Sequence, residues 1–182
     1  YIGAVLDGMP SGVKIDLDFI KKELEKRHSI AEFSTKRHEK DEFKIISGVK
    51  NGFTIGTPIC FLIENRDKRS EDYNDTSFVL RPSHADFVNF VKNGSFADTC
   101  GGGHSSGRIT AALVAAGAVC LLLLKNYGIT VGTHIYDIGG IKDREFNDIE
   151  KDINKLNGKA FAVLDETAKE KIEALGGKAE VI

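Results

Sequence analysis

A loop of glycines and hydroxyl side chains that runs directly into a long apolar segment constrains the fold of this chain more than any other feature. The loop covers Thr99–Ser106, and the apolar segment continues to Lys125. Glycines adopt positive φ readily and let a ligand approach the backbone. Ser105 or Ser106 is a good N-cap for the helix that follows, which we expect to run to about Leu124. The loop and the helix therefore form one structural unit.

This loop has the chemistry of an anion site. A helix start exposes unpaired N–H groups and the positive end of the helix dipole, which suit phosphate, and His104 and Arg108 would add donors beside it. The motif is neither a Walker loop nor Gly-x-Gly-x-x-Gly, and a glycine run before a helix also occurs as a flexible connection. The loop alone leaves both interpretations open.

Composition excludes several classes of partner. A chain of 182 residues, 41% hydrophobic, is long enough for one compact domain with a core. Its net charge is -2, and basic and acidic residues are interleaved along the chain, so we expect no nucleic-acid or membrane partner. Three cysteines without zinc-type spacing indicate a reduced, cytosolic chain and predict no metal site. The run Ile109–Leu124 is shorter than a membrane span, which predicts a buried helix.

The hydrophobic pattern predicts an alternation of strands and helices. Apolar runs predict strands at Ile2–Leu6, Phe43–Val49, Phe53–Ile63, Thr130–Ile138 and Lys178–Ile182. Helical periodicity predicts amphipathic helices at residues 17–27, from Ser83 to about Gly94, at Asn147–Leu156 and at Asp165–Leu175. This alternation indicates an α+β fold with antiparallel sheets packed on helices.

Local signals set several of these boundaries. Asp16 is a predicted N-cap, and Asn147 is another in an Asn-x-x-Glu motif. Asn51–Gly52 is a strong hairpin signal between two strands. Ile59–Ile63 is continuously apolar, which predicts burial on both faces of the sheet, and Gly139–Gly140 ends the later strand.

His84 is the strongest chemical candidate before any family is considered. Ser83-His84-Ala85-Asp86 has the Ser-x-x-acid form of a capping box and follows Pro82, so we expect His84 in the first turn of a helix. A histidine at such a position can serve acid–base chemistry, or it can be a simple surface or capping residue. The basic stretch Arg27–Asp41, taken alone, is typical of a solvated loop.

Two motifs together resemble those of the chorismate synthase family: Arg-Pro-Ser-His-Ala-Asp at residues 81–86, and Gly-Gly-Gly-His-Ser-Ser-Gly-Arg at residues 101–108. The resemblance extends, in the family's order, to Asp7–Gly12, Ser47–Val49, Gly52 with Thr54, Gly56–Ile59, and Arg69–Ser70 with Asp72–Tyr73. It implies a helical core sandwiched between antiparallel sheets. It also implies that residues 1–182 form a single domain that is incomplete, because the family's Gly-Glu-Ser-His-Gly segment and its C-terminal half have no counterpart here.

The activity implied by this resemblance is that of a carbon–oxygen lyase acting on phosphates. The reaction is the anti 1,4-elimination of phosphate from 5-enolpyruvylshikimate 3-phosphate to give chorismate, in the shikimate pathway of aromatic amino acid biosynthesis, with reduced FMN required. The resemblance implies His84 as the catalytic proton donor, His104, Ser105 and Ser106 as FMN-binding residues, and Arg27 and Arg37 as substrate-binding residues. Two departures are Glu32, where another arginine is common, and His104, where many members carry arginine.

The resemblance further implies a cytoplasmic homotetramer and an association with NADP. Because the family's second catalytic histidine and its catalytic aspartate lie in segments without counterpart here, we expect this chain alone to be inactive. Two other classes stay open: a non-catalytic module that binds phosphate or flavin through residues 101–106, and a structural part of an oligomer. In the second, the small residues of the apolar helix would serve only close packing, namely Ala111, Ala112, Ala115, Ala116 and Gly117.

Overall fold

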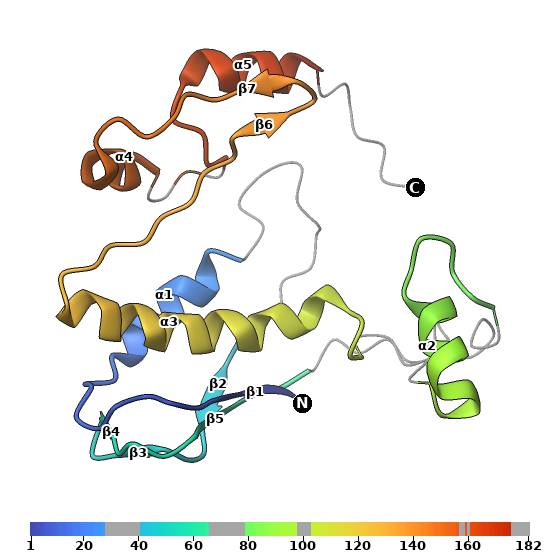
Figure 1. The fold of residues 1–182 in the computed structure, drawn as a ribbon, viewed down its shortest axis with the longest axis vertical. Coiled ribbons are helices and arrows are strands. Elements are labelled where there is room, and N and C mark those ends of the chain that lie inside the picture. The colour runs from blue at the N-terminus through green and yellow to red at the C-terminus, as the bar shows by residue number, and fades with distance from the viewer. Residues whose placement is uncertain (28–40, 66–78, 98–102, 157–158, 160, 176–182) are drawn as a thin grey trace. The chain divides into compact units, whose positions relative to one another are not determined.

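The computed structural model describes residues 1–27, 41–65, 79–97, 103–156, 159 and 161–175. Its contacts divide the chain into two compact units, one of residues 1–27 and 39–122 and one of residues 28–38 and 123–182 (Figure 1). Helices and antiparallel sheets occur together, so the α+β prediction is confirmed. That the whole chain forms one domain stays a prediction, and the strand predicted at 178–182 lies outside the described residues.

The first unit contains a three-stranded antiparallel sheet of β1 (Ile2–Leu6), β5 (Ile59–Ile63) and β2 (Phe43–Ile45), with β5 in the centre. Ile59, Phe61 and Ile63 are completely buried, whereas the side chains between them are half-buried. The expected burial of β5 on both faces therefore holds fully for one face only. Gly3 on β1 lies opposite β5, where an added Cβ would come 2.6 Å from the carbonyl oxygen of Phe61. The close approach of β1 to β5 at this position therefore requires glycine.

A short hairpin extends from this sheet. β3 (Val49–Lys50) and β4 (Phe53–Thr54) pair across Asn51 and Gly52, whose φ values of 52° and 79° are those of the predicted tight turn. The two predicted long arms are thus broken into short strands. The break before β3 falls at Gly48, whose positive φ of 78° interrupts the extended backbone.

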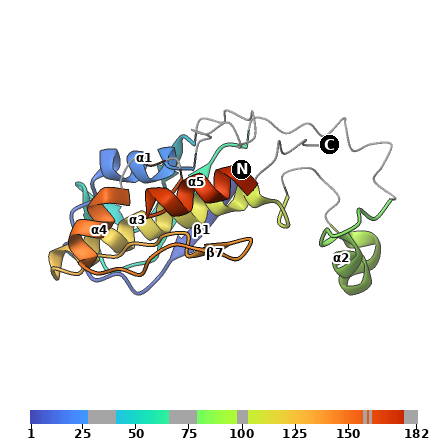
Figure 2. The same cartoon turned by 90° about the horizontal axis from the view of Figure 1, so that it is seen from above.

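Two helices complete the main body of this unit. α1 (Leu17–Glu25) begins at the predicted cap, since Asp16 accepts a hydrogen bond of 3.0 Å from the Phe19 N–H. α3 (Thr110–Asn126) follows a 3₁₀ turn at Gly107–Ile109. Figures 1 and 2 draw α3 alongside α1 and strand β1. Six of its small side chains are buried: Ala111, Ala112, Ala115, Ala116, Ala118 and Val119.

The length predicted for this apolar helix is corrected by the structure. Turn and helix together span Gly107–Asn126, and these 20 residues are long and apolar enough to cross a membrane by length and composition. The prediction that the run is too short for a span is therefore wrong, because the 3₁₀ turn adds two residues before Ile109 and α3 continues two residues beyond Leu124. The buried alanines are also what the core helix of a soluble protein displays.

The start of α2 (Asp86–Asn93) also differs from the prediction. Ala85 occupies the N-cap position without a side-chain hydrogen bond, and Ser83 has a positive φ of 59°. The capping-box prediction is wrong because the Asp86 carboxylate is held by Arg81 and not by the cap backbone. His84 therefore precedes the helix. The end at Gly94, with φ 56°, is as predicted.

The second unit contains a hairpin and two helices. β6 (Asp137–Ile138) pairs with β7 (Ile141–Lys142) across Gly139–Gly140, and α4 (Ile149–Leu156) and α5 (Glu166–Leu175) follow. The predicted strand at Thr130–Ile138 is wrong over most of its length, since ladder pairing in the described chain reaches only its last two residues.

Side-chain caps start both helices of this unit. Asp148, and not the predicted Asn147, accepts a hydrogen bond from the Lys151 N–H at the start of α4. Asp165, at the predicted start of the next helix, caps α5 through a 2.9 Å hydrogen bond from the Thr167 N–H.

A buried carboxylate organises the interior of the second unit. Asp143 accepts hydrogen bonds from the N–H groups of Leu164 (2.6 Å) and Asp165 (2.8 Å), and it lies 2.9 Å from His134 Nδ1. Burial alone would raise the pKa of Asp143, but these hydrogen bonds outweigh it and lower the pKa. The ionised Asp143 side chain thus connects several loop segments through hydrogen bonds.

Candidate functional site

His84 lies in a charged cluster formed before and within the first turn of α2. Its Nδ1 is 2.6 Å from Asp86 Oδ1. Arg81 holds the same carboxylate with two side-chain hydrogen bonds, 2.7 Å from Nε to Oδ2 and 2.9 Å from Nη2 to Oδ1, and a third from its backbone N–H. This bidentate arrangement is the strong form of an arginine–carboxylate pair. His84 is therefore oriented by its own motif.

The charge state of this cluster follows from the same contacts. The Arg81 side-chain hydrogen bonds hold the pKa of Asp86 well below its usual range, with smaller contributions from the Arg81 backbone N–H and from His84. The His84 side chain is 31% exposed, so the ring can be reached from solvent. The cluster thus contains a solvent-accessible imidazole in contact with an ionised carboxylate.

The described part of the predicted flavin loop is Gly103–Ser106. Ser106 caps the 3₁₀ turn before α3 by accepting a 3.2 Å hydrogen bond from the Arg108 N–H, so its predicted capping position is confirmed. Ser105 Oγ accepts a 2.8 Å hydrogen bond from Asn89 Nδ2 on α2. Gly101 and Gly102 lie outside the described residues.

A cavity of about 550 Å³ opens beside this loop. Its wall combines the start of β1 with the segment that leads into α3: Tyr1, Ile2, Gly3, Ala4, Gly103, His104, Ile109, Thr110 and Leu113. The volume is within the range of small-molecule sites, and mostly apolar walls with a few polar groups are typical of them. His104, which the sequence placed in the cofactor site, is therefore a cavity-lining residue.

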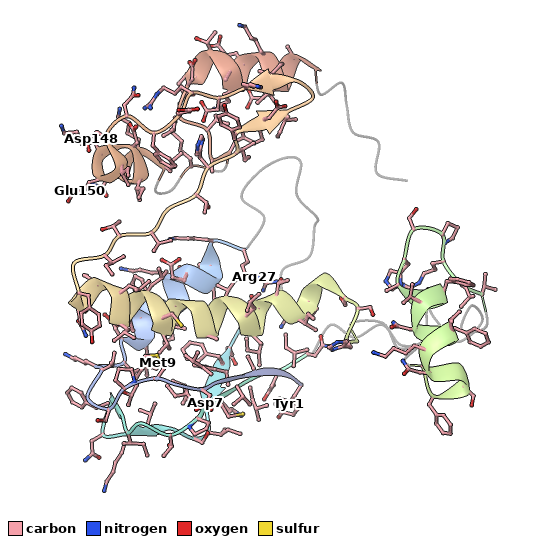
Figure 3. The ribbon with its side chains drawn as sticks, in the orientation of Figure 1. Tyr1, Asp7, Met9, Arg27, Asp148 and Glu150 are labelled. Carbon is pink, nitrogen blue, oxygen red and sulfur yellow. The ribbon has the colours of Figure 1, made fainter. Side chains whose placement is uncertain are left out.

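Arg27 belongs to a second charged cluster, at the end of α1. Its Nη1 donates to Asp41 Oδ2 over 2.7 Å, and its Nη2 donates to Thr110 Oγ1 over 3.0 Å. Figure 3 labels Arg27. The other oxygen of Asp41 accepts a hydrogen bond from Arg108 Nη1, and Arg108 Nη2 donates to the carbonyl of Glu64. Thr110 also lines the cavity, so this cluster adjoins it. Arg37 lies outside the described residues.

Arg108 differs from its expected role as a donor beside an anion. Only 8% of the residue is exposed, and its guanidinium contacts Asp41 and Glu64. The sequence analysis also missed Asn89 as a partner of Ser105, and no local motif signals that contact. Within the described ranges, no group of three or more His, Cys, Asp or Glu side chains is arranged to hold a metal ion.

The family comparisons agree with these motifs. A family model described as chorismate synthase matches residues 1–182. The chorismate synthase of Nitratiruptor sp. is 48% identical over 147 residues, covering 80% of this chain and 41% of the relative. That of Dehalococcoides mccartyi (strain BAV1) is 41% identical over 192 residues, covering 100% of this chain and 53% of the relative.

A solved structure gives the same result at the level of the fold. A crystal structure of chorismate synthase superposes with a TM-score of 0.67 at 26% identity, covering 95% of this chain and 48% of the other. The chain spans about half the length of the curated relatives it matches. The chain belongs to the chorismate synthase family.

Proposed function

We propose that this chain is the part of a chorismate synthase that carries the proton donor for phosphate release and a flavin-binding loop. The reaction is the reduced-FMN-dependent anti 1,4-elimination of phosphate from 5-enolpyruvylshikimate 3-phosphate. The observation that carries the proposal is the family match over all of residues 1–182, which includes both motifs. The intact protein would act in the cytoplasm as a homotetramer, in association with NADP.

His84 serves as the proton donor in this proposal. A base takes a proton from one ring carbon, and the electrons of that C–H bond form a new double bond. The existing ring double bond moves toward the carbon that carries the phosphate, and the carbon–oxygen bond breaks with its electron pair leaving on the phosphate. The departing phosphate needs a proton from a group that titrates near neutrality, which suits imidazole. An accessible His84 ring held by Asp86 supports this assignment.

The flavin loop is supported by the donors and the cavity around it. His104 lines a cavity of about 550 Å³, and Ser105 and Ser106 present hydroxyls at the same loop. These residues fit a flavin, because the cavity wall is largely apolar and the loop hydroxyls suit a phosphate. Reduced FMN would supply transient electron donation without net redox change.

The substrate anions are assigned to Arg27 and Arg37. Arg27 already lies beside Thr110 on the cavity wall, and its two terminal nitrogens contact Asp41 and Thr110. Guanidinium groups bind phosphate and carboxylate in bidentate fashion.

An anaerobic assay of the intact protein tests the proposal. Chorismate should form from the substrate with pre-reduced FMN and should not form with oxidised FMN. Equal turnover in the two conditions would overturn the assignment. Flavin binding without turnover in either condition would instead support a non-catalytic binding module.

A further inference from the structure

The carboxylate of Asp86, which contacts His84, is itself held by three hydrogen bonds from Arg81. Asp86 Oδ1 lies 2.6 Å from His84 Nδ1, a separation at which a proton must lie between the two atoms. Because Asp86 is ionised, it has no proton to give. The proton therefore resides on Nδ1, and the ring donates.

Arg81 also approaches this ring nitrogen, with Nη2 3.2 Å from Nδ1. A guanidinium has only donors, so it can bond to Nδ1 only if that nitrogen has a free lone pair. The shorter contact with Asp86 excludes that arrangement. Arg81 instead donates to Asp86 Oδ1 over 2.9 Å, and both donors thus converge on one oxygen.

We propose that Asp86, held by Arg81, is a positioning residue that fixes the Nδ1-protonated form of His84 and leaves Nε2 to face the substrate. This inference rests on the proposed role of His84 as a proton donor. In the charged ring, Nε2 carries the proton that is given to the departing phosphate, while Nδ1–H stays bonded to Asp86. Without the carboxylate, Arg81 would be the partner of Nδ1 that remains in the described part of the chain, and its donors would force the opposite tautomer.

Among the residues that the structure describes, the charged groups in contact with the His84 ring are Arg81, from the segment before α2, and Asp86, from its first turn. The carboxylate stabilises the charged ring and the guanidinium opposes it. Removal of Asp86 leaves the Arg81 guanidinium as the charged partner of the ring within the described ranges.

The test is Asp86→Ala in the intact protein, with the tautomer of His84 read by ¹⁵N NMR and with single-turnover kinetics on pre-reduced flavin. In the unaltered protein, the neutral ring should carry its proton on Nδ1. In the variant, it should carry the proton on Nε2. The rate of the chemical step should fall on the order of 10²-fold or more, the scale seen when a histidine loses the carboxylate that sets its tautomer.

Asp148→Ala is the matched control, because it also removes a carboxylate at the start of a helix, α4 (Figure 3). It should leave the tautomer and the rate unchanged. An unaltered protein with the proton on Nε2 would overturn the inference without any variant, even if Asp86→Ala failed to fold. An unchanged rate and tautomer in a folded Asp86→Ala would also overturn it. If the unaltered protein has no turnover, the proposed function fails while the NMR readout still decides the tautomer.

Discussion

Arg27 and Asp41 form an ion pair whose carboxylate is almost excluded from solvent. The distance from Arg27 Nη1 to Asp41 Oδ2 is 2.7 Å, and the Asp41 side chain is only 3% exposed. The same carboxylate accepts a hydrogen bond from Arg108, whose side chain is 6% exposed. One buried carboxylate thus pairs with two guanidinium groups at the edge of the cavity.

Replacement of Asp41 by Ala should therefore destabilise the first unit strongly. Loss of the shared partner leaves the buried Arg108 charge without this compensation, which costs about 3–5 kcal/mol in other proteins. Urea unfolding measures the change in the free energy of unfolding. Asp18→Ala is the control, since its ion pair with Lys21 is exposed and long at 3.9 Å, and its loss should cost about 1 kcal/mol or less. Similar costs for the two variants would contradict the expectation.

Replacement of Ser105 and Ser106 together by Ala should weaken FMN binding in the intact protein while the fold is kept. Hydroxyl and cap contacts contribute on the order of 1 kcal/mol each, so the dissociation constant should rise roughly tenfold or more. Flavin titration measures it. If Asn89 orients Ser105, Asn89→Ala should weaken binding a few-fold, whereas Asn93→Ala on the same helix should not. An unchanged constant in the double variant would mean that the loop is only a connector.

Acid should destabilise the second unit through Asp143 and Asp152. The pKa of Asp152 is lowered chiefly by the side-chain hydrogen bonds of Arg144, at 2.6 and 2.8 Å, and the pKa of Asp143 is lowered as described above. A carboxyl whose pKa is lower in the folded state stabilises the fold above its unfolded pKa of about 3.9. That stability is lost as the pH falls through the folded pKa.

Hydrogen exchange of the Leu164 and Asp165 amides reports this loss directly, because both N–H groups donate to Asp143. After correction for intrinsic exchange rates, their protection should be constant from neutral pH to about pH 5 and decline below about pH 4. In Asp143→Asn the decline should be shallower. Protection that increases with acid would contradict the sign of this linkage.

Local signals in the sequence predicted the parts of the fold that depend on neighbouring residues. Asp16, Asn51–Gly52 and Gly94 act as expected because a cap or a tight turn is satisfied within a few positions. The capping box at Ser83 failed because Arg81, five residues before Asp86, competes for the carboxylate. The strand at Thr130–Ile138 failed because an alternating pattern forms a strand only where a partner pairs with it.

The site was predictable at the level of motifs but not of contacts. Arg81–Asp86 and the loop through Ser106 were found because the family resemblance lies in contiguous residues. The pairing of Asp41 with Arg108 joins residues 67 positions apart, and Asn89 meets Ser105 across 16 positions. Such pairs follow from the packing of helices and loops, which no short pattern encodes.

The sharpest prediction concerns His84 itself. If His84 protonates the departing phosphate, His84→Ala should lower the rate of the chemical step by roughly 10²- to 10⁴-fold, with much smaller changes in substrate and FMN affinity. Single-turnover kinetics in the intact protein with pre-reduced flavin measures this rate. A histidine that lies on the surface of the turn before α2 and takes no part in catalysis should instead affect stability by about 1 kcal/mol or less and leave turnover nearly unchanged. A rate within about threefold of the unaltered protein, well below the tenfold that 1.4 kcal/mol represents, would remove His84 from the mechanism.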